Sequence, residues 1–180
     1  MTDAVLLRPA TLEDLSLLLA TETPVSASFN WSGHRDGNRL RERLEGNGLI
    51  DQDAGSLVVQ AAGDAVGSVG WTARHWSTPP WSLAWEIGIT LMPQARGRGI
   101  GSQAQRLLCD YLFATTNVHR LQATTNADNV AEQQALLSAG FLHEGVVRGA
   151  EWLLGGYTDV HLFGRLRSEW VQPTDLRAHL

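Results

Sequence analysis

The chain has 180 residues, of which 43% are apolar, and its formal net charge is −5 at neutral pH. This length and apolar share suit one domain with a hydrophobic core, which excludes a disordered tail protein, while the negative charge excludes a chain-wide basic surface for wrapping nucleic acid. Because no run approaches the roughly 18 apolar residues of a membrane-spanning helix, and acids stand where a signal peptide is basic, we expect one cytoplasmic domain over residues 1–180, without nucleic-acid or membrane partners.

Short strands and helices alternate along the first half of the chain. Thr11 followed by Asp14 is typical of a helix start, and the spacing of Leu40 and Leu44 indicates a second helix that stops at a Gly-Asn-Gly sequence. In chain order we predict a strand over 5–8, a helix to about residue 20, a helix over 39–44, a hairpin of strands 56–61 and 65–73, a loop over 75–80 and a strand over 83–91.

The second half begins with a glycine-rich turn that leads directly into an amphipathic helix. Apolar residues from Ile100 to Leu112 recur at spacings of 4, 7, 8, 11 and 12, which is one helix face. A strand over 121–125, a helix over 130–139 ended by Gly140, and a closing hairpin of 141–152 and 157–166 around Gly155-Gly156 follow. The order of elements predicts a mixed α+β fold.

The turn over residues 96–101 reads Arg-Gly-Arg-Gly-Ile-Gly. Glycines at alternate positions allow successive backbone N–H groups to converge at a helix N-terminus, where the helix dipole favours an anion, so the turn is suited to a phosphate or pyrophosphate. Arg96 and Arg98 add positive charge and forked donors. The competing interpretation is a tight turn with close helix-to-strand packing. Dinucleotide binding is disfavoured because the turn follows a mid-chain strand rather than a first strand.

These residues resemble the GNAT acyl-CoA N-acyltransferases. The turn matches the Arg/Gln-x-x-Gly-x-Gly/Ala pyrophosphate signature of that family, and Asn129 with Gly140-Phe141 eleven residues later is similar to its second signature. The segments Glu144–Arg148 and Gly156–Asp159 resemble the Rim-type branch, the ribosomal-protein N-terminal acetyltransferases and their relatives. The likeness covers residues 83–170 well and the first eighty residues only through their element order.

The resemblance implies a GNAT fold, with a mixed twisted central sheet whose central strands splay apart, flanked by about four helices, and acetyl-CoA held in the gap. The pantetheine arm would pair with the backbone of Ile89, Thr90 and Leu91 like an added strand. The pyrophosphate would lie on the amides of Gly97, Arg98, Gly99, Ile100 and Gly101, with Ser102. Asn129 would contact the pantetheine arm, although with Glu132 it also suits a helix N-cap and capping box, and both roles are compatible.

Transfer of an acetyl group to an amine requires a group that accepts or routes the amine proton, and the departing thiolate benefits from an acid. Glu86 and Glu151 are the candidate bases, because each stands where members of the family hold a catalytic glutamate. Each also has a structural explanation. Glu86 suits a hydrogen-bonded strand carboxylate, and Glu151 suits an exposed charge on a hairpin. The acid stays open: Glu132 replaces the serine of the Rim-type branch, the usual tyrosine is missing, Ser138 suits a helix surface and Tyr157 a structural role. Water can also protonate the thiolate.

The expected reaction transfers the acetyl group of acetyl-CoA to a primary amine by direct attack within a ternary complex. The acceptor is either a small-molecule amine or a protein N-terminal α-amine. Tryptophans near the expected acceptor groove slightly favour a small molecule, although they also suit a core: Trp31, Trp71, Trp76, Trp81 and Trp85. The alternative is a non-catalytic acyl-CoA-binding sensor. We expect no metal, since the six histidines are scattered and the single cysteine cannot form a metal cage. The resemblance is compatible with a homodimer.

Overall fold

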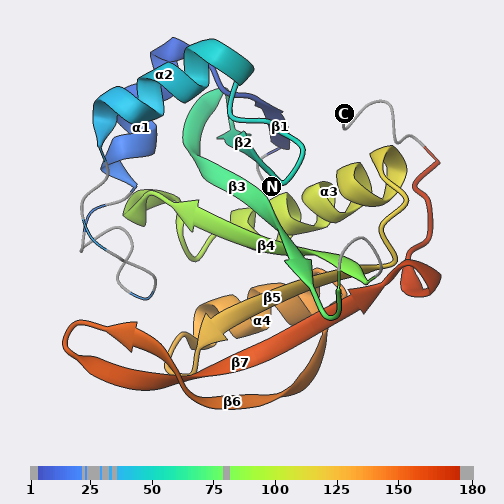
Figure 1. Cartoon of the computed structure of the whole chain (residues 1–180). Helices are drawn as coiled ribbons and strands as arrows, with labels where there is room; N and C mark the ends of the chain where they lie inside the picture. Colours follow the sequence, from blue (N-terminus) through green and yellow to red (C-terminus); the bar gives the residue numbers. More distant parts are fainter. Residues whose placement is uncertain are drawn as a thin grey trace.

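One twisted sheet organises the computed structural model, which describes residues 4–21, 23, 29, 33, 36–78 and 82–174. Among these residues seven strands pair in the order β1-β2-β3-β4-β5-β7-β6 (Figure 1). Neighbouring strands are antiparallel except for β4 and β5, which are parallel. The strands are β1 (Val5–Pro9), β2 (Ala54–Ala61), β3 (Asp64–His75), β4 (Leu83–Leu91), β5 (Arg120–Asn126), β6 (Leu142–Leu153) and β7 (Gly156–Leu166).

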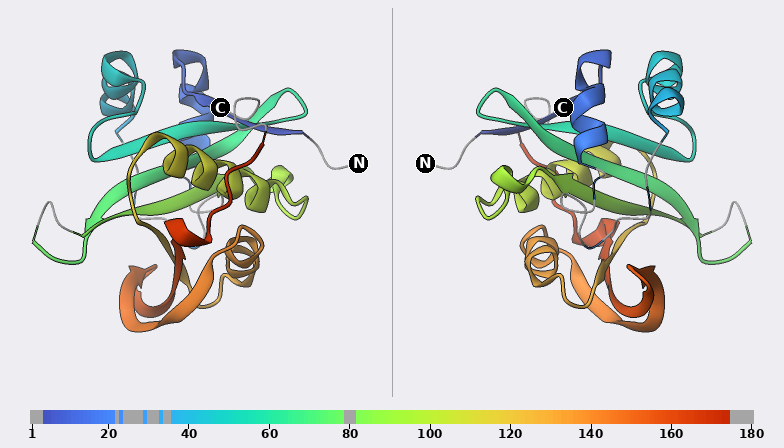
Figure 2. Two further views of the ribbon diagram at one scale, coloured as in Figure 1. Left: turned by 90° about the vertical axis from the view of Figure 1, so that its right-hand side faces the viewer. Right: turned by 90° about the vertical axis from the view of Figure 1, so that its left-hand side faces the viewer.

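The helices lie on both faces of the sheet. They are α1 (Leu15–Ala20), α2 (Gly37–Asn47), α3 (Ile100–Thr115) and α4 (Val130–Ser138). Val58 of β2 packs with α1 and α2, whereas its neighbours Leu57 and Val59 belong to the larger core with α3 and α4, because successive strand side chains point to opposite faces. Figure 2 shows α1 and α2 together, apart from α3 and α4. No helix in the described part of the chain has the length and apolar character needed to cross a bilayer.

The two central strands separate after a short paired section. β4 and β5 pair only where residues 84–86 face residues 120–122. Beyond that point β4 continues to Leu91 paired with β3, and β5 continues to Asn126 paired with β7. The inner edge of β4 from residue 87 onward therefore has no strand partner on the β5 side. This arrangement confirms the mixed sheet with splayed central strands that the family resemblance implies.

The predicted elements recur in the structure with small shifts at their ends. The strand over 83–91 and the helix that follows the glycine turn begin at the expected residues. The last hairpin turns at Leu154 and Gly155 rather than at Gly155-Gly156. Both turn residues have positive φ, 49° and 93°, because a two-residue hairpin turn that matches the strand twist requires a left-handed backbone there.

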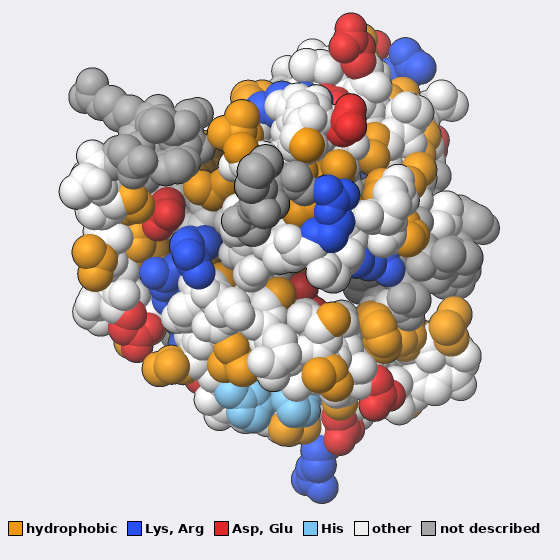
Figure 3. Space-filling model, turned by 180° about the vertical axis from the view of Figure 1, so that it is seen from behind, with side chains coloured by type: hydrophobic (Ala, Val, Ile, Leu, Met, Phe, Trp, Pro, Cys, Tyr) orange, Lys and Arg blue, Asp and Glu red, His pale blue; other side chains and the backbone are white. Residues whose placement is uncertain are grey.

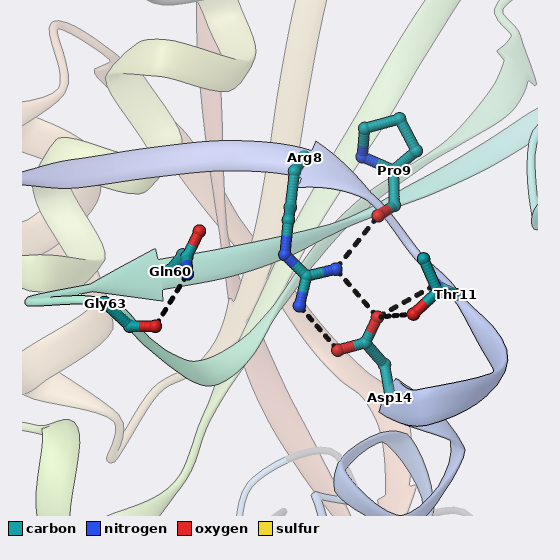
Figure 4. A network of polar contacts seen from close by, with 6 residues as sticks. All are labelled: Arg8, Pro9, Thr11, Asp14, Gln60 and Gly63. Carbon is teal, nitrogen blue, oxygen red and sulfur yellow. Dashed lines mark hydrogen bonds and ion pairs between the residues drawn. The ribbon is translucent and has the colours of Figure 1, made fainter.

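A polar network fixes the connection between β1 and α1. The Asp14 carboxylate accepts two hydrogen bonds from the Arg8 guanidinium, at 2.8 and 2.7 Å, and two from the backbone N–H and hydroxyl of Thr11, at 2.8 and 3.0 Å (Figure 4). The side chain of Asp14 is only 5% exposed. The bidentate Arg8 contact outweighs burial and lowers the pKa of Asp14 to about 2.

We expect Asp14→Asn to destabilise the fold by about 2 kcal/mol at neutral pH. Because the folded pKa lies below the ordinary value of 3.8, this stabilisation is complete above about pH 5 and is lost as the pH falls towards 2. Urea unfolding should therefore show about half of that difference between variant and wild type at pH 3. The exposed Asp64→Asn serves as the control. An Asp14→Asn effect of equal size at both pH values would contradict the ion-pair account.

Candidate active site

The gap between β4 and β5 holds a cavity of about 520 Å³. Its walls come from the inner edge of β4 over 87–91, the glycine turn with Ser102, the end of β5 over 124–126, α4 with its N-cap, and Glu151 of β6. Segments distant in the sequence thus meet at the point where the sheet opens, and the volume suits a small-molecule site.

The glycines of the turn differ in their backbone conformation. Gly97 and Gly99 have φ of 71° and 77°, a left-handed backbone that side chains rarely adopt, and Gly99 is the N-cap of α3. At Gly101 φ is not positive, and an added Cβ would make only ordinary van der Waals contacts with the side chains of Leu91 and Ile89, at 3.7 and 4.0 Å. The first N–H groups of α3 have no partner inside the helix and lie at its positive end. The turn therefore has the geometry of an anion site.

The arginines of the turn differ from their expected roles. Arg96 lines the cavity, but its Nε and one Nη donate to the Leu91 carbonyl at 3.0 and 2.9 Å. A backbone carbonyl at the end of a strand needs a donor, so this arginine fastens β4 to the turn. Arg98 does not line the cavity, and neither does Ile100, whose side chain is 1% exposed in the core. Ile100 can contribute only its backbone to a ligand.

The inner edge of β4 faces the cavity. Ile89, Thr90 and Leu91 all line it, and each is paired with β3 through its other side. An extended ligand can pair with such an edge as an added strand would. The Leu91 carbonyl is the exception, because Arg96 already donates to it.

The start of α4 brings Asn129 and Glu132 to the cavity. Asn129 caps the helix by accepting a bond from the Glu132 N–H at 3.4 Å, as the capping interpretation predicts, and it also lines the cavity. The reciprocal half of the capping box is not formed, because the Asn129 N–H donates to the carbonyl of Asn126. The Glu132 carboxylate instead accepts a bond from Gln105 of α3 at 2.5 Å. Burial raises the pKa of Glu132 to about 7, and the bond from Gln105 opposes this shift.

Glu151 reaches the cavity from β6 near an irregularity in the strand pairing. The register between β6 and β7 shifts between Val147 and Glu151, and Gly149 within that shift has φ of 57°. A bulge of this kind re-aims the side chains next to it. Asn126 donates to the Glu151 carboxylate at 3.4 Å and to the Thr158 hydroxyl at 2.9 Å. The end of β5 therefore orients Glu151.

Glu86 is the last residue of β4 that pairs with β5, and it does not line the cavity. Its carboxylate accepts a bond from Arg74 Nε at 2.7 Å and a weaker one from an Nη at 3.4 Å. Gln122 and Thr124 of β5 donate to it at 3.1 and 3.2 Å. This environment matches the interpretation of Glu86 as a hydrogen-bonded strand carboxylate, and its contacts hold β4 and β5 together where the split begins.

Phe29 lines the cavity, whereas the other aromatic residues in the described part of the chain do not. Trp71 and Trp85 are each 6% exposed in the core, whereas Trp76 is 60% exposed and donates to Gln122. Tyr157 is 73% exposed and packs against Trp152, so it does not reach the site. Trp31 and Trp81 lie outside the described residues.

The sequence identified the turn, the β4 edge, Asn129 and Glu151, all of which meet at the cavity. It missed the lining residues at the end of β5 and also Ser138, which lines the cavity although it was expected only on a helix surface. It treated Glu132 as a capping-box partner and as a departure from the family pattern, not as a residue of the site. The signal for Glu132 was its place in the first turn of a helix next to the split.

Comparisons with known proteins agree with this geometry. A profile of the family described as "Acetyltransferase (GNAT) domain" matches residues 4–142. The uncharacterized N-acetyltransferase p20 of Bacillus licheniformis is 27% identical over 176 residues, which are 94% of this chain and 97% of that protein. A ribosomal-protein-serine acetyltransferase of Escherichia coli (strain K12) is 26% identical over 153 residues, 83% of each chain.

A solved structure shares the same fold. Spermidine N-acetyltransferase from Vibrio cholerae, crystallised with CoA and spermine, superposes with a TM-score of 0.78 over 92% of this chain and 96% of that one, at 20% identity. At this identity the likeness concerns the arrangement of strands and helices.

Proposed function

The chain belongs to the GNAT acetyltransferase family, and we propose that it transfers the acetyl group of acetyl-CoA to a primary amine by direct attack within a ternary complex. Family membership agrees with the resemblance drawn from the turn and from Asn129. The observation that carries the proposal is the cavity in the split of the sheet, which joins the anion-binding turn at one side to the Glu151 carboxylate at another.

The residues present fit acetyl-CoA. The amides of residues 97–101, with Ser102, would hold its pyrophosphate, since the left-handed Gly97 and Gly99 turn the backbone so that successive N–H groups converge. The open edge of β4 at Ile89 and Thr90 would pair with the pantetheine arm, and Asn129 would contact the arm from α4. When bound, acetyl-CoA supplies the activated acetyl group.

Glu151 is the base in this proposal, rather than Glu86. A protonated amine has no lone pair, so a group beside the acyl carbon must accept or route its proton. Glu151 lines the cavity and is oriented by Asn126, whereas Glu86 lies outside it and is tied to Arg74. Both features favour Glu151 as the carboxylate that receives the amine proton.

The names of two related proteins point to two kinds of amine as the acetyl acceptor. One relative is named for ribosomal-protein serine acetylation and a structural neighbour for spermidine acetylation. We propose a primary amine, either a small-molecule amine or a protein N-terminal α-amine. Trp71 and Trp85 are core residues, so these two tryptophans do not favour the small molecule.

Release of free thiol from acetyl-CoA in a panel of polyamines, aminoglycosides and N-terminal peptides tests the proposal. We expect turnover with at least one class of amine. Calorimetry with CoA, run in parallel, separates the alternatives. Tight CoA binding without turnover across the panel would favour an acyl-CoA-binding sensor. Absence of CoA binding would contradict the assignment of the cavity as the acetyl-CoA site.

Replacement of Glu86 by glutamine separates the two candidate bases. The carboxylate already receives bonds from Arg74, Gln122 and Thr124, so we expect Glu86→Gln to lower kcat/KM by less than about fivefold, against the roughly 100-fold or greater loss typical of a missing general base. The pH dependence of kcat/KM should keep the wild-type shape. A flattened rise of rate with pH would instead make Glu86 the base.

A further inference from the structure

The described part of the cavity lining contains three ionisable side chains, Arg96, Glu132 and Glu151. No histidine, cysteine or tyrosine is among those lining residues. His143 and His161 stack on each other with ring centroids 4.8 Å apart, and histidine side chains gather on the outer surface in Figure 3. Arg96 donates to the Leu91 carbonyl, and a guanidinium has no atom that accepts a proton. Proton transfer inside the cavity therefore depends on the two glutamates.

As an acid in the first turn of α4, Glu132 suits the helix dipole, but its carboxyl does not complete the cap of the helix. The capping box that its spacing suggests is only half formed, because the Asn129 N–H is taken by Asn126. Its carboxyl extends from the first turn of α4 to Gln105, a residue of α3 that is 1% exposed. A carboxyl that lines a cavity and is held by one buried amide is placed for chemistry rather than for capping.

Gln105 can hold this carboxyl in either protonation state. In the present orientation its Nε2 donates to Glu132, while its buried Oε1 has no hydrogen-bond partner. An amide offers a donor and an acceptor of nearly the same shape, so a flip would let Oε1 accept a bond from a protonated Glu132. Of the other charged groups nearby, Glu151 lies in the same cavity, and Arg106 of α3 donates to the Ser138 carbonyl at the far end of α4.

We propose that Glu132 is the general acid of the reaction, which protonates the departing thiolate, and that Gln105 is its positioning residue. This inference rests on the proposed acetyl transfer. As the C–N bond forms, the C–S bond breaks and its electron pair goes to sulfur. The proton of the Glu132 carboxyl moves to that sulfur, and the proton lost by the amine nitrogen goes to Glu151. Glu132 then takes a proton from solvent, and Glu151 returns its proton to solvent.

The acidity of Glu132 matches the task. Burial raises its pKa to about 7, so about half of the molecules carry the proton at neutral pH. A thiol such as that of cysteine has a pKa of about 8.5, so transfer of the proton from Glu132 to a thiolate is downhill. Efficient general acids have pKa values close to the working pH.

The test compares Glu132→Gln with the wild type and with Glu45→Gln, an exposed glutamate of α2, in thiol-release assays at saturating acetyl-CoA and amine. We expect kcat of Glu132→Gln to fall about 100-fold, at the lower end of the range for a lost acid-base group, while the dissociation constant of CoA changes less than about threefold. The fall of kcat above about pH 7 in the wild type should disappear in this variant, and Glu45→Gln should match the wild type.

Gln105→Met supplies a second, independent readout. Because the bond from Gln105 lowers the pKa of Glu132, its loss should move the high-pH fall of kcat to higher pH. An unchanged kcat and pH profile in Glu132→Gln would overturn the acid assignment. A wild type that releases no thiol with any amine would instead reject the acetyl-transfer function, so the two failures are distinguishable. Thermal unfolding shows whether each variant still folds. If Glu132→Gln does not fold, the pH profile of kcat in Gln105→Met tests the acid assignment.

Discussion

Replacement of Gly99 by valine is expected to raise the dissociation constant of CoA about 100-fold while the chain still folds. Gly99 caps α3 with φ of 77°, and a β-branched residue is strained in this left-handed conformation. Relief of that strain would turn the amides at the start of α3 away from one another. The loss corresponds to about 2.7 kcal/mol, the value of one or two hydrogen bonds to a charged group. Isothermal titration calorimetry with CoA measures it directly.

Gly63→Val is the matched control for this prediction. Gly63 lies in the β2–β3 turn beside Gln60, has φ of 92°, and an added Cβ there meets nothing within 4 Å (Figure 4). Both variants should lose about 1–2 kcal/mol of stability from the same backbone strain, so their Tm values should fall alike. Only Gly99→Val should lose CoA affinity. If the Tm of Gly99→Val falls like that of the control but its CoA affinity equals that of the wild type, the turn serves packing and not CoA binding.

Glu151→Gln is expected to lower kcat/KM by about 100-fold or more at neutral pH, because a positioned general base contributes that much to proton transfer. Glutamine keeps the shape of the side chain and can still contact Asn126, so the fold and the binding of CoA should be preserved. Steady-state kinetics over about pH 6 to 9, with one amine from the panel, provides the measurement.

The comparison of Glu151→Gln with Glu86→Gln makes this result specific. Both variants remove one carboxylate by the same isosteric change. Asn126, the partner of Glu151, and Arg74, the partner of Glu86, both stay in place. A large loss in Glu151→Gln alone supports a base inside the cavity. Equal, small losses in both variants would mean that solvent carries the amine proton and that catalysis depends mainly on positioning.

The fold followed closely from local patterns. Alternating and helical apolar spacings located the strands and helices, since they report which face of an element is buried. The Thr11–Asp14 pair marked the start of a short 3-10 turn that leads into α1. The glycine turn was also visible, because positive φ at Gly97 and Gly99 is a local demand that selects glycine regardless of distant contacts. In contrast, the turn at Leu154 was missed, as leucine seldom adopts positive φ.

The amino-acid sequence by itself determined the strand-turn-helix unit around residues 96–101, the order of the elements and the family signatures. Only the tertiary structure decided which glutamate faces the cavity, because Glu86, Glu132 and Glu151 lie on three different elements and look alike in one dimension. Arg74 binds Glu86 at the sheet surface, Gln105 of α3 binds Glu132 of α4, and Asn126 of β5 donates to Glu151 of β6. Each partner is far from its glutamate in the chain, so the role of each carboxyl depends on long-range pairing that residue spacing does not encode.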